Sequence, residues 1–212
     1  MIYVFIFITG VCLGSFYACI GYRIPNKISI VKPSSFCPNC KNSLKWYMNI
    51  PLLSYIIFGL NYQLIVVLTL ISALMVSLVT DLKYYYISDR VIVVSSILVA
   101  LTYLKFLGVN SFLSHILSGT LMFILMYLLK IITTKIFKKE SLGDGDIKLM
   151  ILIGLTLGVF NSFISLFISS VTALIYTILF IKKKDALIPF GPFLLLGAIV
   201  TYILVFYQIT II

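Results

Sequence analysis

The stretch Leu149–Ile181, LMILIGLTLGVFNSFISLFISSVTALIYTILFI, contains no charged residue over a length that exceeds one membrane crossing. A transmembrane helix needs about 20 predominantly apolar residues. Asn161 and Ser162 place two adjacent polar residues near the middle of this run, so we expect a turn there. The run should therefore form a short crossing followed by one of ordinary length.

Apolar runs of this kind make up most of the chain. Five others cover residues 2–20, 63–80, 91–107, 112–132 and 190–212. The chain is 62% hydrophobic and only 10% charged, whereas ordinary soluble domains are roughly 45–50% apolar and about 25% charged. One aqueous core cannot bury this proportion of apolar side chains, so their solvent is the lipid bilayer. The sequence predicts an all-α, polytopic membrane helical bundle.

The basic residues indicate how the bundle is oriented. They crowd three connections, at residues 23–45, 130–139 and 182–184. Loops rich in lysine and arginine face the cytoplasm. This distribution accounts for the net charge of +10, and we therefore predict no nucleic-acid partner.

Counting crossings back from the later basic loops places the connection 81–90 in the cytoplasm too. An even number of crossings must then separate it from the first basic loop, so the weaker segment 46–60 must cross or re-enter. This predicts about eight crossings, two of them short or re-entrant. We divide the chain into an N-terminal part, residues 1–62, and a membrane-embedded core, residues 63–212.

Carboxylates are rare in this chain, which has six acidic residues. Asp81 directly follows the run that ends at Thr80, and Asp146 directly precedes the run that begins at Ile147. Both lie at the predicted cytoplasmic boundary. We interpret Asp89 and Asp185 as ordinary charges at the ends of spans.

Asp146 lies in the sequence Gly143-Asp144-Gly145-Asp146. The two glycines permit a positive φ or the close approach of another segment. Paired carboxylates suit peptide hydrolysis, because two such groups about 3 Å apart cannot both ionise. The ionised group then activates water while the protonated group hydrogen-bonds the carbonyl.

Asp81 and Asp146 are therefore our candidate catalytic pair, with Gly143, Gly145 and Lys148 as supporting residues. Lys148 could tune the pair or bind substrate, and it could equally extend its ammonium to the membrane interface. A non-catalytic membrane scaffold or a small proton- or ion-coupled transporter is the alternative function for the same two aspartates.

Five ordered motifs resemble the prepilin peptidase family, also called type IV leader peptidases, which are aspartic proteases with a Gly-x-Gly-Asp motif. The two motifs with the catalytic aspartates are Asp81-Leu82-Lys83 through Ile87-Ser88-Asp89 and Gly143 to Leu149. The others are Gly14-Ser15-Phe16 with Tyr22 to Pro25, Cys37-Pro38-Asn39-Cys40 with Leu44 to Tyr55, and Ile188 to Phe193.

The resemblance implies a fold and a function. It implies eight crossings of the bacterial inner membrane, with Asp81 and Asp146 as catalytic residues toward the cytoplasm. It implies prepilin or pseudopilin precursors as partners, cleaved after a glycine, as in competence or protein secretion. Proteolysis by an aspartate pair requires no cofactor, whereas many members also methylate the new N-terminus with S-adenosylmethionine. The sequence leaves methylation open.

The first loop departs from the family pattern. Many members carry two Cys-x-x-Cys pairs there, a set that suits a four-thiolate zinc site. This chain has Cys37 and Cys40 and no cysteine after them. These two are the candidate metal ligands, but without the second pair we do not expect a stable structural zinc site.

Overall fold

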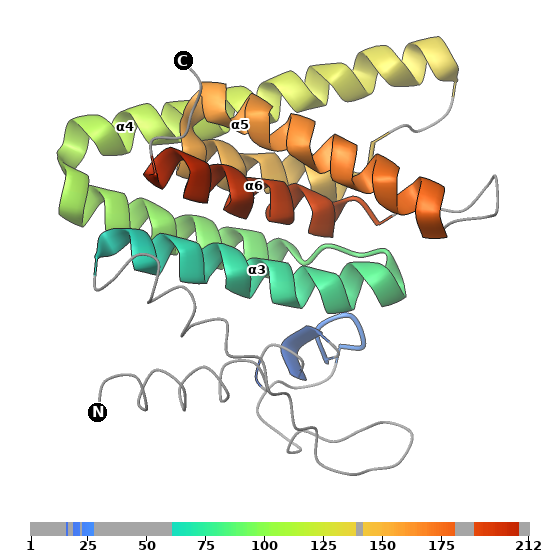
Figure 1. The fold of residues 1–212 in the computed structure, drawn as a ribbon, viewed down its shortest axis with the longest axis horizontal. Helices are drawn as coiled ribbons and strands as arrows, with labels where there is room; N and C mark the ends of the chain where they lie inside the picture. Colours follow the sequence, from blue (N-terminus) through green and yellow to red (C-terminus); the bar gives the residue numbers. More distant parts are fainter. Residues whose placement is uncertain are drawn as a thin grey trace.

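The computed structural model describes residues 16, 19–21, 23–27, 61–138, 142–180 and 189–207. Its long elements are α3 (Tyr62–Tyr84), α4 (Asp89–Phe137), α5 (Asp144–Phe180) and α6 (Gly191–Phe206). Within these described ranges there is no β-strand. The elements lie side by side as a bundle with roughly aligned axes (Figure 1). The all-α prediction is therefore confirmed for this part of the chain.

Both long elements turn back at a glycine. Gly108 inside α4 has φ 83° and ψ 175°, and Gly158 inside α5 has φ 76° and ψ 173°. Glycine is essentially the only residue that adopts this backbone region. Each element is thus two helices, and Figure 1 shows α4 folding back on itself. Together with α3 and α6 this makes six helical segments, over the ranges where the sequence predicts six crossings.

The break in α5 corrects the turn that we expected at Asn161 and Ser162, because both residues are helical. Asn161 Nδ2 donates to the Leu157 carbonyl oxygen (3.2 Å) and Ser162 Oγ donates to that of Gly158 (2.5 Å). Their polar groups are therefore satisfied inside the helix. A short helix followed by an ordinary one is confirmed, at about 21 Å and about 33 Å for 1.5 Å per residue.

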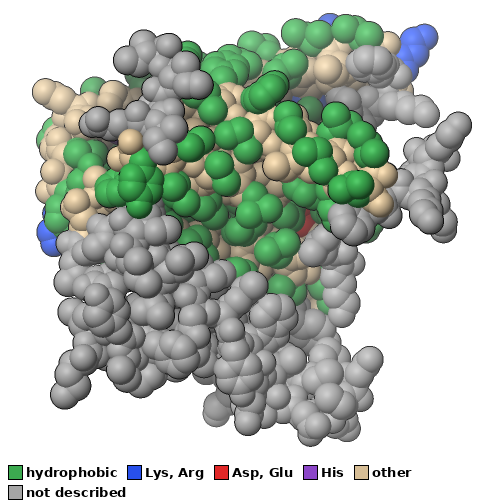
Figure 2. Space-filling model, in the orientation of Figure 1, with side chains coloured by type: hydrophobic (Ala, Val, Ile, Leu, Met, Phe, Trp, Pro, Cys, Tyr) green, Lys and Arg blue, Asp and Glu red, His purple; other side chains and the backbone are tan. Residues whose placement is uncertain are grey.

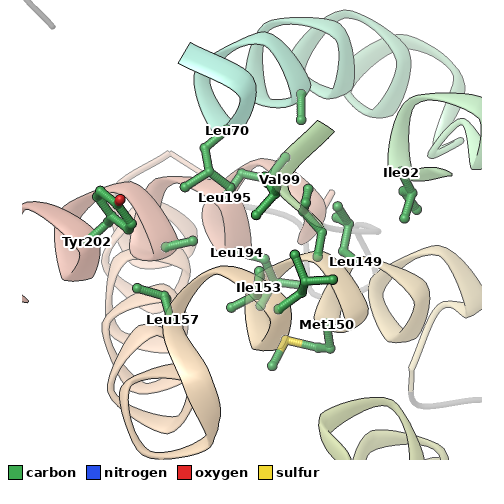
Figure 3. Close-up of a cluster of buried hydrophobic side chains, with 14 of the residues drawn as sticks. Leu70, Ile92, Val99, Leu149, Met150, Ile153, Leu157, Leu194, Leu195 and Tyr202 are labelled. Carbon is green, nitrogen blue, oxygen red and sulfur yellow. The ribbon is translucent and has the colours of Figure 1, made fainter. Parts of the chain in front are cut away.

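Apolar side chains from all four elements form one core (Figure 3). α4 makes its most extensive contact with α5. Gly154 lets these two backbones approach closely, because a Cβ there would lie 2.8 Å from the Ser118 carbonyl oxygen. The side chains at the centre are fully buried and include Leu70, Val99, Leu149, Met150, Ile153, Leu194 and Leu195.

Many apolar side chains also lie on the outside of the bundle, as the face in Figure 2 shows. Along the first half of α4 the exposed side chains include those of Val93, Val94, Ile97, Leu98 and Leu101. α3, α4 and α5 are each long and apolar enough to cross a bilayer. Large apolar side chains on the outside are expected where lipid replaces water, so the chain is a membrane protein.

Four helix ends meet at one end of the bundle. They are the C-terminal end of α3 and the N-terminal ends of α4, α5 and α6 (Figure 1). The C-terminal end of α4, with Lys135 and Lys138, lies at this end too. The segment 46–60 and most of 2–20 lie outside the described residues, so the number of crossings stays a prediction.

Candidate active site

A cleft of about 740 Å³ opens among these helix ends. It contains every catalytic and supporting residue that the sequence predicts. The lining consists of Asp81, Tyr85, Tyr86, Ile87, Asp89, Leu142, Gly143, Asp144, Gly145, Asp146, Lys148, Pro189 and Phe190. Residues from the end of α3, the start of α4, the start of α5 and the segment before α6 therefore share one site.

Asp81 lies in the last turn of α3 and is only 6% exposed. α3 ends at Tyr84 because Tyr85 adopts the left-handed conformation (φ 50°, ψ 41°), with its N–H donating to the Asp81 carbonyl oxygen. The Asp81 carboxyl group accepts a hydrogen bond at Oδ2 from the Gly191 backbone N–H (3.2 Å). α6 therefore orients a side chain from α3.

Asp146 lies in the first turn of α5 and is half-buried. Its carboxyl group is close enough to that of Asp81 for the two charges to interact. Two ionised carboxylates in such proximity repel one another, so the pair is expected to share a proton. The structure thus brings together the two aspartates that the sequence singles out.

Ile87 packs against two glycines of the site, a contact that sequence reasoning missed. A Cβ at Gly145 would lie 2.9 Å from Ile87 Cβ, and a Cβ at Gly191 would lie 2.6 Å from Ile87 Cδ1. The expected close approach at Gly145 is confirmed. Positive φ is recorded at Gly108 and Gly158 and at neither Gly143 nor Gly145. The sequence offered one indication of this contact, because Ile87 belongs to the motif that begins at Asp81.

Two ion pairs join α4 to the start of α5. Lys148 Nζ lies 2.8 Å from both carboxylate oxygens of Asp89, and Lys130 Nζ lies 2.5 Å from Asp144 Oδ1. Lys148 is therefore held within the cleft wall. Asp89 does begin α4, as an end-of-span charge should, but our interpretation omitted its ion pair and its place in the cleft.

Several predicted residues lie outside the described ranges, among them Cys37, Cys40 and Asp185. Within the part of the chain that the structure covers, no group of three or more His, Cys, Asp or Glu residues is placed to hold a metal ion. The polar groups of the cleft include carboxyl groups, the ammonium group of Lys148 and backbone N–H groups.

Comparison with known proteins places this chain in a family. Residues 68–178 match the profile of the type IV leader peptidase family, and residues 8–78 match the bacterial peptidase A24 N-terminal domain. No solved structure matches the chain.

Three relatives are each named "Prepilin leader peptidase/N-methyltransferase". The Vibrio cholerae protein is 30% identical, over 98% of this chain and 98% of the relative. The Bacillus subtilis protein is 27% identical, over 93% and 92%. The Myxococcus xanthus protein is 29% identical over 71% of this chain, and that match spans 55% of the relative's own length. The chain therefore belongs to the type IV leader peptidase family of enzymes.

Proposed function

We propose that this chain is an aspartic endopeptidase that removes the leader of prepilin or pseudopilin precursors. The observation that carries the proposal is the pair of carboxyl groups, Asp81 and Asp146, in one cleft at the end of the bundle. The relatives' names supply the substrate class.

The environments of the two carboxyl groups suggest how they divide the work. The Gly191 N–H donates to Asp81, and a donor of this kind stabilises the ionised form of an acid. We therefore assign the shared proton to Asp146. Asp81 accepts a proton from a water molecule as the water oxygen bonds to the scissile carbonyl carbon, while Asp146 donates a hydrogen bond to the carbonyl oxygen. The C–N bond then breaks as the leaving amine takes up the proton that Asp81 accepted from the water.

The position of the cleft suits a cut near a membrane surface. The cleft lies where four helix ends meet, and the basic end of α4 lies at the same end of the bundle. Because basic connections face the cytoplasm, we place the cleft at the cytoplasmic face of the bacterial cell membrane. A precursor with an apolar helix in the bilayer would present its leader junction at this level.

The test is co-expression of a pseudopilin with Asp81→Asn or Asp146→Asn. Each substitution preserves the side-chain shape and removes the ionisable group, so we expect a folded protein whose cleavage rate falls by about 10³-fold or more. Asp185→Asn, which changes a predicted helix-end charge, should cleave normally. Unchanged processing in either dyad variant would defeat the assignment, and altered ion flux with normal processing would favour the transporter alternative.

We also propose that the cleaved N-terminus is methylated, because the relatives' names include this activity and residues 8–78 match the family's N-terminal domain. S-adenosylmethionine would be the methyl donor. The processed pseudopilin should then gain the mass of one methyl group when wild-type enzyme and S-adenosylmethionine are both supplied. An unmodified N-terminus after complete cleavage would reject methylation and leave the peptidase assignment intact.

A further inference from the structure

The connection between α3 and α4, residues 85–88, is held against the start of α5 at two neighbouring points. Ile87 fills the space between Gly145 and Gly191. Two residues later, Asp89 binds Lys148 through both carboxylate oxygens at 2.8 Å. On α5, Lys148 lies two residues beyond Asp146, so the ion pair ties the connection to the helix turn that carries this aspartate.

The same connection begins one helical turn after Asp81. Any shift of residues 85–88 relative to α5 therefore changes how Asp81 faces Asp146. Apolar packing at Ile87 resists compression of the two segments, but by itself it does not fix their register along α5. The ion pair between Asp89 and Lys148 adds a second attachment between the same segments, and it opposes their sliding along α5.

We propose that the Asp89–Lys148 ion pair is a positioning pair that sets the approach of Asp81 to Asp146. The proposal rests on the proposed peptidase function. Neither residue takes or gives a proton in the reaction. Their role is to hold the α3–α4 connection on α5, so that both carboxyl groups reach the same water molecule.

The magnitudes separate positioning from simple stabilisation. The side chains of Lys148 and Asp89 are 43% and 59% exposed, and ion pairs this exposed contribute little to folding stability. A displacement of about 1 Å in an active site, in contrast, can cost about 10²-fold in rate. Loss of the pair should therefore lower kcat measurably and change the melting temperature little.

The rival role is direct contact with substrate, since both residues line the cleft. A residue that binds substrate equally in the ground state and the transition state changes KM and leaves kcat unchanged. A residue that positions the dyad changes kcat and leaves KM nearly constant. Kinetics of the purified full-length enzyme on a pseudopilin precursor distinguish the two roles.

The experiment is a double-mutant cycle with Asp89→Asn, Lys148→Met and the combined variant. We expect each single change to lower kcat by about three- to fivefold, the limit for an interaction of about 1 kcal/mol, with KM within about twofold and the melting temperature nearly unchanged. The combined variant should be no slower than either single variant, because both changes remove the same interaction. Lys130→Met, which breaks the other ion pair between α4 and α5, is the matched control and should keep wild-type kcat.

Wild-type kcat in a folded single variant, additive losses in the combined variant, or a rise in KM at constant kcat would each overturn the positioning role. Asp81→Asn is assayed alongside. Cleavage that does not depend on Asp81 would defeat the peptidase assignment itself, whereas cleavage that depends on Asp81 but not on the ion pair defeats only this inference.

Discussion

Gly143 and Gly145 stand on either side of Asp144, yet their surroundings differ. A Cβ at Gly143 would lie 3.2 Å from Asp146 Oδ2, the end of a side chain that can rotate away. A Cβ at Gly145 would meet Ile87 at 2.9 Å from its Cβ, an atom fixed by the backbone. Of the two, Gly145 has the more rigid neighbour.

We therefore predict that Gly145→Ala lowers kcat/KM by about 10- to 100-fold, because the α3–α4 connection must move away from α5 and a misplacement of this size is costly in an active site. Gly143→Ala should lower it by about 10-fold, because its new Cβ displaces the Asp146 carboxyl group itself. Cleavage of a pseudopilin precursor by each purified variant gives the comparison. If Gly145→Ala keeps the wild-type kcat/KM, the packing of Ile87 does not control the site.

The two aspartates of the candidate site could be singled out from the sequence, whereas the contacts around them could not. Asp81 and Asp146 are conspicuous because carboxylates are rare beside apolar runs and each lies at a span boundary. The partners of Asp89 and Ile87 lie on α5 and α6, and the Lys148–Asp89 contact alone spans 59 positions along the chain. No local pattern encodes a contact of that range.

At the scale of the helices, two glycines determine where the long elements fold back. Gly108 and Gly158 share almost the same backbone conformation, and a Cβ at either position would meet nothing within 4 Å. A side chain would therefore fit in space, but the backbone angles strongly disfavour it. The position of each break follows from conformational freedom rather than from polarity.

Gly158→Ala should accordingly destabilise the fold by about 1–3 kcal/mol, since the new residue must adopt a region that is essentially restricted to glycine. Asn161→Ala, at the turn expected from polarity, removes a single hydrogen bond of 3.2 Å and should cost no more than about 1 kcal/mol. Unfolding of the detergent-solubilised variants measures both values. A larger loss for Asn161→Ala than for Gly158→Ala would contradict a break at Gly158 and favour the turn expected at Asn161.

The sequence predicted the extent of these elements well and the break in α5 poorly. Apolar run length is a direct physical requirement of the bilayer. The five runs from residue 63 onward, one of them long enough for two crossings, appear as six helical segments. Polar side chains such as Asn161 and Ser162 do not force a turn, because they can bond to the carbonyl oxygens of the preceding turn. Gly158 carried the signal, and glycine also occurs within helices at Gly119 and Gly154.

At the scale of the whole molecule, the chain reverses direction at Gly108. Each half of α4 therefore runs from one end of the bundle to the other. Lys138 follows α4 at the end of the bundle where the cleft opens, and Lys105 lies just before the break. Both residues are exposed. Their placement makes the predicted orientation in the membrane directly measurable.

In a background with all four native cysteines replaced by serine, we expect Lys138→Cys to react with a membrane-impermeant maleimide only from the cytoplasmic side. Lys105→Cys should react only from the opposite side, because one helix of about 28 Å separates Gly108 from the start of α4. Intact cells expose the outer face of the membrane to the reagent, and inverted vesicles expose the cytoplasmic face. Labelling of both positions from one side would contradict the membrane-spanning arrangement of α4.

The meeting of four helix ends around the cleft has an electrostatic consequence. A helix N-terminus carries roughly half a positive elementary charge from its aligned peptide dipoles, an effect confined to the first turn. Asp89 lies in the first turn of α4, Asp144 and Asp146 lie in that of α5, and Asp81 accepts the first amide of α6. The carboxylates at the starts of α4 and α5 therefore face backbone charge of opposite sign, and at Asp81 the α6 amide offsets the negative end of the α3 dipole. The backbone itself therefore lowers the free-energy cost of placing these carboxylates beside the membrane. A side-chain substitution would remove this effect only if it unwound a helix.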